Sequence, residues 1–262
     1  MTPSKAVISG PDEIVYSINN PNRTPVVLIH GWGCSSKDWD GVIKSMGDQY
    51  TTLTLDLPGH GGSTSSSNVV SIRQMADDVA ATMDDAGIDR AVIVGHSMGG
   101  AIAAEFAARY PARASLVIGA DTWHYLQLYP KQEEAGVEDF AGTFAVDFRA
   151  SVDALVEMSS ILSTPDDIKQ QVRRSTLSVE MPLGLTELVD LLRWDLDSVL
   201  AKIKVPVVSI VADDLVSDEA IERYADRMTF VRFQGVSHYL LLEDPSGSAD
   251  RIKDAIANHV SA

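Results

Sequence analysis

Residues 91–100 read AVIVGHSMGG, and they hold the strongest signal in the chain for its fold. Residues 91–94 form a short apolar run typical of a buried strand, and residues 101–110 have the pattern of a helix. Between them lies a G-x-S-x-G motif centred on Ser97. Between a strand and a helix, this motif forms a tight turn, with small residues on both sides, that exposes the serine hydroxyl. The sequence therefore predicts Ser97 as a nucleophile.

Short apolar strand patterns alternate with longer helical patterns over much of the chain. This alternation is typical of an α/β fold with a mostly parallel sheet and crossover helices. Residues 26–29 and 92–94 are almost continuously apolar, which predicts strands buried on both faces. The predicted strands are 14–18, 26–30, 51–56, 91–95, 115–120, 205–211 and 230–233. The predicted helices are 37–49, 72–86, 99–110, 218–227 and 249–260.

The alternation stops between residues 123 and 200, where only helical patterns occur, at 152–162, 165–173 and 187–192. An all-helical insertion in such a fold is expected over the carboxyl ends of the strands, where open sheets bind ligands. The alternative is a set of extra helices packed at the sheet edge. The predicted parts are a first core part (1–122), a helical cap or lid (123–200) and a second core part (201–262).

Composition and charge limit the partners of this 262-residue chain. The formal charge of −16 gives an acidic surface that repels nucleic acid and anionic lipid. No run of 18 or more apolar residues predicts a membrane span, and residues 1–11 do not resemble a secretory signal. The single cysteine, Cys34, fits a reducing cytoplasm, and we interpret it as a packing residue. We therefore expect a cytoplasmic protein without nucleic-acid or membrane partners.

A serine nucleophile needs a base that accepts its proton. His238 ends the stretch GVSH (235–238), directly after the last predicted strand. From that loop a histidine can reach a serine at the top of the central strand, so His238 is the predicted general base.

The developing negative charge on the attacked carbonyl oxygen also needs hydrogen-bond donors. The Met98 N–H, at the start of the helix after the nucleophile, is the first predicted donor. The second is expected from the loop HGWG (30–33), where we predict the Trp32 N–H. His30 is expected to brace this loop by hydrogen bonding.

Four motifs together resemble the α/β-hydrolase superfamily, in its order and spacing and over essentially the whole chain. They are HGWG (30–33), DLPGHG (56–61), GHSMGG (95–100) and GVSH (235–238). The resemblance implies an α/β-hydrolase fold, with a helical cap inserted after the sixth core strand. It also implies Ser97 as nucleophile, His238 as base, and Trp32 with Met98 as the oxyanion hole. A serine at this position differs from haloalkane dehalogenases and epoxide hydrolases, which have an aspartate there.

Three aspartates are candidates for the acid that orients His238. Many α/β-hydrolases carry it in a G-x-x-D pattern after the strand predicted at 205–211, but this chain has a leucine at the expected position. A shorter loop would bring Asp214 or Asp213 there. In some haloalkane dehalogenases and in cofactor-free quinolone dioxygenases the acid follows the preceding core strand, where this chain has Asp121. Chain order fits all three, so we keep all three, with Asp121 as first choice.

Many apolar and aromatic side chains in residues 123–200 suggest an apolar pocket, and Trp123 is the predicted substrate-binding residue because it begins the insertion beside Asp121. Basic residues are sparse near the predicted site motifs, which disfavours an anionic substrate. The resulting prediction is a hydrolase of a small to medium apolar ester or lactone, acting through an acyl-enzyme.

No cofactor is expected, and the histidines show no HExxH or other metal-ligand spacing, so no metal is expected either. The expected partner is a small-molecule substrate, and no motif predicts an oligomeric state. Two alternatives stay open. One is a C–C bond hydrolase or cofactor-free dioxygenase on the same fold, and the other is a ligand receptor with slow turnover.

Overall fold

The computed structural model describes residues 4–260, and within them the chain forms a nine-stranded sheet. The strand order is β1-β2-β4-β3-β6-β7-β8-β9, and β5 pairs with β2 beside this path. The strands from β4 to β9 along this order are parallel, whereas β2 is antiparallel to β1, β4 and β5. The bounds are β1 (Lys5–Ser9), β2 (Asp12–Asn19), β3 (Thr24–Ile29), β4 (Tyr50–Leu55), β5 (Thr64–Ser65), β6 (Ala91–His96), β7 (Ala114–Ala120), β8 (Val207–Ala212) and β9 (Thr229–Phe233). The predicted α/β fold class is confirmed.

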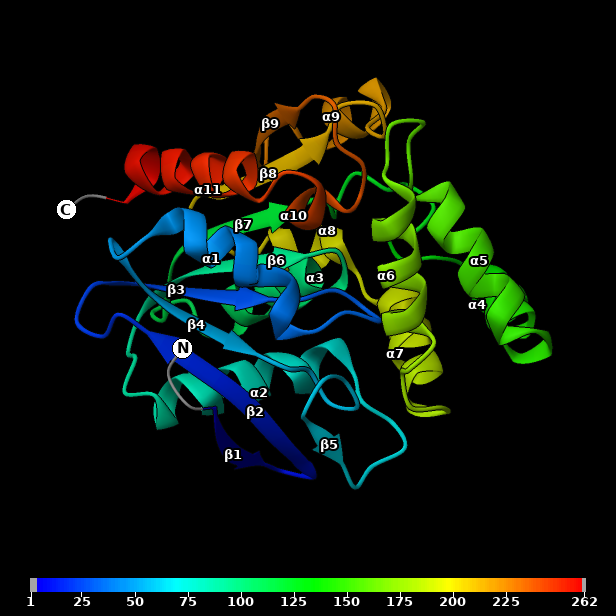
Figure 1. The fold of residues 1–262 in the computed structure, drawn as a ribbon, viewed down its shortest axis with the longest axis horizontal. Coiled ribbons are helices and arrows are strands. Elements are labelled where there is room, and N and C mark those ends of the chain that lie inside the picture. The colour runs from blue at the N-terminus through cyan, green and yellow to red at the C-terminus, as the bar shows by residue number, and fades with distance from the viewer. Residues whose placement is uncertain (1–3, 261–262) are drawn as a thin grey trace.

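Helices cover both faces of this sheet, as Figure 1 shows. Because successive side chains of a strand point to opposite faces, Val92 and Val94 of β6 pack in one apolar cluster and Ile93 in another. The first cluster contains side chains of α1 and α11, and the second contains side chains of α2 and α3. The bounds are η1 (Ser36–Trp39), α1 (Asp40–Met46), α2 (Ile72–Asp85), α3 (Met98–Arg109), α9 (Asp218–Tyr224), α10 (Leu240–Glu243) and α11 (Pro245–His259). The central strands are therefore buried on both sides, as their apolar runs predicted.

Five helices lie between β7 and β8, and we call them the inserted helices. They are α4 (Glu134–Val146), α5 (Phe148–Met158), α6 (Asp166–Thr176), α7 (Leu183–Arg193) and α8 (Leu196–Leu200). Figure 1 shows α4 to α7 gathered at the end of the sheet toward which the arrows of the central parallel strands point. When the two-residue β5 is set aside, β7 is the sixth strand along the chain, so the helices follow the sixth core strand as predicted.

The structure differs from the predicted elements at several places. Every predicted strand is present, but β1 and β5 were not predicted, and neither were α4, α8 and α10. Helix α4 contains Gly136 and Gly142, which lower helix propensity and hide its pattern. The helix predicted at 37–49 is divided into η1 and α1, and it ends at Met46 because Gly47 turns the chain with φ of 70°.

Within residues 4–260, no helix combines the length and the apolar character that crossing a lipid bilayer requires.

Asp78 of α2 is a buried carboxyl that makes stability depend on pH. Burial raises its pKa to about 7, and its neighbour Asp12 adds to the shift, against hydrogen bonds from Ser9 and Gln74. The folded chain therefore keeps a proton that the unfolded chain loses near pH 4, so the free energy of unfolding falls as pH rises from about 4 to about 7.

We expect Asp78→Asn to remove this slope, because asparagine retains an acceptor for Gln74 and carries no charge. The variant should be more stable than wild type at pH 8 by about 2 kcal/mol, and by much less at pH 5. Urea unfolding at the two pH values measures the difference, and an equal gain at both would contradict the assignment.

Candidate active site

Ser97 occupies the turn between β6 and α3 in a conformation that L-residues rarely adopt, with φ of 54° and ψ of −124°. The flanking glycines make this turn possible. A Cβ atom at Gly95 would lie 1.9 Å from the Gly99 carbonyl oxygen, and one at Gly99 would lie 2.4 Å from the Ile29 carbonyl oxygen. Side chains larger than hydrogen therefore do not fit at either position, which explains the G-x-S-x-G pattern physically.

His238 and Asp121 meet beside this turn, although 117 positions separate them in the sequence. His238 Nδ1 lies 2.7 Å from Asp121 Oδ2. Asp121 directly follows β7, and its other oxygen, Oδ1, accepts the Ala212 N–H at 2.7 Å. Since an ionised carboxylate only accepts hydrogen bonds, Nδ1 carries the proton, and Nε2 is left as the ring's acceptor.

The carboxyl of Asp121 is fully buried and still remains ionised. Burial alone would raise its pKa, but the electrostatic interaction with His124, whose Nε2 lies 3.5 Å from Oδ1, and the hydrogen bond from His238 outweigh burial and hold the pKa well below the usual value. Donation by Tyr125 acts in the same direction. The Asp121 carboxylate is therefore a fixed negative charge next to His238 Nδ1.

Two further histidines brace the surrounding loops. His96 Nε2 donates to the His238 carbonyl oxygen at 2.8 Å. His30 Nδ1 donates to the Gly31 carbonyl oxygen at 2.7 Å, and its Nε2 accepts the Leu57 N–H at 2.9 Å. Burial lowers the pKa of each ring to about 3, so both are neutral near pH 7. This agrees with the expected bracing role of His30.

The N–H groups of Trp32 and Met98 are buried next to the Ser97 turn, with the two residues 8% and 1% exposed. Within the described residues 4–260, neither group donates a hydrogen bond to the protein. Most buried backbone N–H groups have a partner, so two orphan donors near one hydroxyl are unusual. Trp32 and Met98 both line the adjoining cavity.

This cavity has a volume of about 280 Å³ and is lined by Ser97 and His238 together with side chains of α4 to α7. Among the described residues that line it, none is an Asp, Glu, Lys or Arg. The apolar lining residues include Phe140, Leu155, Val172 and Leu188. The nucleophile candidate and the base candidate therefore face a largely apolar space.

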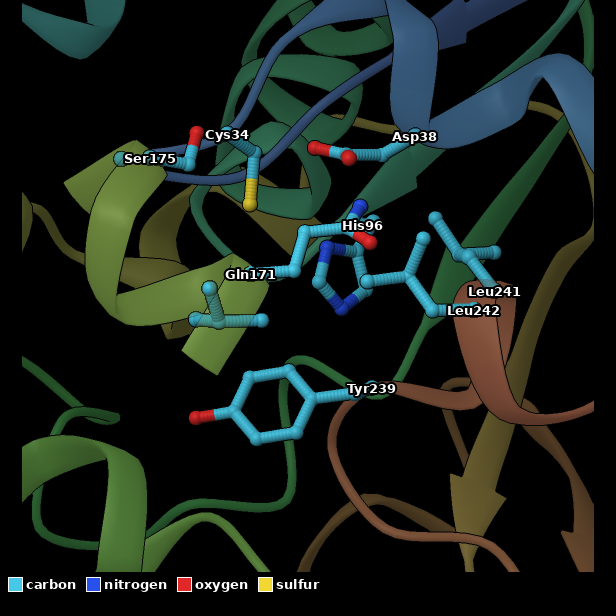
Figure 2. A pocket seen from close by; sticks show the side chains of 10 residues that line it. Cys34, Asp38, His96, Gln171, Ser175, Tyr239, Leu241 and Leu242 are labelled. Carbon is cyan, nitrogen blue, oxygen red and sulfur yellow. The ribbon is translucent and has the colours of Figure 1, made fainter. Parts of the chain in front are cut away.

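A second, much smaller cavity of about 20 Å³ lies beside His96, as Figure 2 shows. Cys34 lines both cavities. Burial raises the pKa of its thiol well above the usual value, and the nearby Asp38 carboxylate adds to the effect. A thiol that stays protonated is a poor nucleophile, in line with the interpretation of Cys34 as a packing residue.

Three predicted residues are placed away from His238 or from the large cavity. Asp213 Oδ1 accepts a hydrogen bond from Arg232 Nη1 at 2.8 Å near the surface. Asp214 is exposed and lines a separate surface pocket. Trp123 was predicted to bind substrate, but it is fully buried in the core, where it packs against Gly119. The cavity is lined instead by Tyr125, which the sequence did not single out.

Within residues 4–260, no three His, Cys, Asp or Glu side chains are grouped so that they could hold a metal ion.

The family model of the alpha/beta hydrolase fold matches residues 24–245. Over 98 residues the chain is 44% identical to the dihydrolipoyllysine-residue acetyltransferase component of the acetoin cleaving system from Cupriavidus necator. The matched stretch covers 37% of this chain and 26% of that protein. The chain spans 26% to 37% of the length of the curated relatives that it matches first.

Two solved structures are similar over almost their whole length, each with a TM-score of 0.84. One is a thermophilic esterase from Thermogutta terrifontis, 21% identical, covering 98% of this chain and 99% of that one. The other is the enol-lactonase from Burkholderia xenovorans LB400, 20% identical, covering 97% and 100%. At this identity the similarity shows the fold. Together with the match over residues 24–245, it shows that the chain belongs to the α/β-hydrolase fold family.

Proposed function

We propose that the chain hydrolyses a carboxylic ester or lactone of a small to medium apolar molecule, with Ser97, His238 and Asp121 as its catalytic triad. The main support is the hydrogen bond of 2.7 Å between Asp121 and His238 at the cavity that Ser97 also lines. The similarity in fold to an esterase and an enol-lactonase is consistent with this chemistry.

The proposed reaction has two halves. Ser97 Oγ attacks the carbonyl carbon while His238 Nε2 takes the hydroxyl proton, and the N–H groups of Trp32 and Met98 stabilise the oxyanion. His238 then gives its proton to the leaving alkoxide, and an acyl-enzyme remains. A water molecule, deprotonated by His238, releases the acid and restores Ser97. Asp121 stabilises the imidazolium that forms in both halves.

We further propose that the segment 123–200 acts as a cap that shields this reaction from water. The inserted helices supply much of the cavity lining, and the Trp32 indole N–H donates to the Gly184 carbonyl oxygen of α7 at 2.9 Å. The low cysteine content of the sequence supports the cytoplasm as the proposed location.

The uncharged lining of the cavity leads to a prediction about substrate charge, and this prediction tests the proposal. A neutral p-nitrophenyl ester should be hydrolysed with kcat/KM roughly a hundredfold or more above that of its analogue with a terminal carboxylate, since no lining cation compensates a buried charge. A series of increasing acyl length should reach an optimum where the 280 Å³ space is filled.

The measurement is initial-rate release of p-nitrophenol, with Ser97→Ala as the background. Hydrolysis of the neutral ester at the Ser97→Ala rate would contradict the proposed function, and a carboxylated ester cleaved equally well would contradict the proposed substrate class.

A further inference from the structure

Tyr125 lies five positions into the chain after β7 and touches both the acid and the base of the proposed triad. Its hydroxyl oxygen is 2.5 Å from Asp121 Oδ2 and 3.1 Å from His238 Nδ1. His238 Nδ1 bonds the same Oδ2 atom at 2.7 Å. The three groups therefore form a closed triangle around one carboxylate oxygen.

The directions of these bonds follow from the donors present. Asp121 Oδ2 can only accept, so the Tyr125 hydroxyl donates to it, and the Nδ1 proton of His238 points to Oδ2 with the Tyr125 oxygen as a second acceptor. Burial raises the pKa of Tyr125 well above the usual value, and the Asp121 charge adds to this, so the hydroxyl keeps its proton.

The ring of Tyr125 is held in place from two sides. It packs against the His124 ring with centroids 4.1 Å apart, and its edge meets the His238 ring at 5.4 Å with an interplanar angle of 78°. The hydroxyl is thus aimed at Asp121 by packing, which reduces the entropy lost on forming the bond.

We propose that Tyr125 is a positioning residue that fixes the His238 ring and takes up part of the Asp121 charge. This inference rests on the proposed function of the triad. A hydroxyl that donates to Oδ2 competes with the imidazolium for the same oxygen, so less of the Asp121 charge is left to stabilise the imidazolium that forms in the proposed reaction. The second acceptor at Nδ1 also restricts rotation of the ring.

Other groups face this pair from each neighbouring element. They are His96 at the end of β6, His124 and Tyr129 on the segment after β7, the Ala212 N–H of β8, and Tyr239 next to the base. Burial lowers the pKa of His96 and His124, so both are neutral near pH 7. Among these neighbours, Tyr125 contacts both Asp121 Oδ2 and His238 Nδ1, so its loss changes the hydrogen bonding between Asp121 and His238 most directly.

The test is the pH profile of kcat/KM for Tyr125→Phe, which keeps the ring and removes the hydroxyl. We expect the acid limb to move to higher pH by roughly half to one unit, and kcat at the optimum to fall roughly tenfold with little change in KM. Tyr129→Phe is the matched control, because it removes another buried tyrosine hydroxyl, 3.4 Å from Thr122 Oγ1, on the same segment. Its acid limb should not move. An unmoved limb in Tyr125→Phe would overturn the proposal.

A second measurement does not depend on turnover. The Nδ1 proton of His238, bound to a buried carboxylate, should give a downfield proton resonance in wild type and in Ser97→Ala, and Tyr125→Phe should shift it. An identical resonance in Tyr125→Phe would contradict the role of Tyr125, whereas ester hydrolysis that does not exceed the Ser97→Ala rate would contradict only the proposed function.

If Tyr125→Phe does not fold, difluorotyrosine at position 125 replaces it. As a stronger donor it should move the acid limb to lower pH, and a limb that stays in place would overturn the proposal.

Discussion

Ser97→Ala is expected to lower kcat for a neutral p-nitrophenyl ester by a factor on the order of 10⁵ to 10⁶. The substitution removes the atom that would attack the carbonyl and leaves the orphan N–H groups of Trp32 and Met98 in place. The residual rate should therefore reflect binding and oxyanion stabilisation alone. Alanine is smaller than serine, so the positive φ at this position is no more strained than before.

Ser45→Ala is the matched control for this experiment. Ser45 lies on α1 and donates to the Gly41 carbonyl oxygen, away from the residues that line the cavity. Its kcat/KM should stay within about twofold of wild type. Retention of more than about one per cent of activity by Ser97→Ala, with Ser45→Ala near wild type, would rule out Ser97 as the nucleophile.

Asp121→Asn is expected to have the second largest effect, a fall in kcat of roughly 10³ to 10⁴. The asparagine side chain is nearly isosteric, can accept the Ala212 N–H and tolerates the φ of 50° at this position, so the fold should survive. Its amide can donate to His238 Nδ1, which favours the tautomer with the proton on Nε2. The ring would then have no free nitrogen to accept the proton of Ser97.

Asp213→Asn and Asp214→Asn are the controls, because the sequence left both as alternatives. Asp213 binds Arg232 and Asp214 is exposed, so each change should alter kcat by less than about threefold. The measurement is kcat on one ester for all three variants, with thermal unfolding to verify folding. A loss in Asp213→Asn or Asp214→Asn as large as in Asp121→Asn would contradict the assignment of the acid.

The fold was predictable wherever one pattern dominated a segment. Residues 91–100 combine a continuous apolar strand with a turn that only small flanking residues permit, and both features can be recognised in the amino-acid sequence. Helix α4 was missed because two glycines weaken its pattern, and it forms in contact with α5 and α7. Local propensity does not report such tertiary support.

The proposed site was predictable where motifs carry it, at Ser97, His238, Trp32 and Met98. The sequence did not decide which aspartate is the acid, because an aspartate reaches His238 only if its strand ends close to His238 in the folded chain. The place of Trp123 next to Asp121 did not reveal the direction of its side chain, which packs in the core against Gly119. Tyr125 was missed because its contact with His238 joins positions 113 residues apart.

The most direct test of the central claim is covalent labelling by a fluorophosphonate, which forms a stable adduct with an activated serine. The tryptic peptide 91–109 contains Ser97 as its single serine. We predict stoichiometric labelling of this peptide in the wild type, none in Ser97→Ala, and labelling slowed by orders of magnitude in His238→Ala. Labelling at another residue, or at the same rate in His238→Ala, would contradict the proposal that His238 activates Ser97.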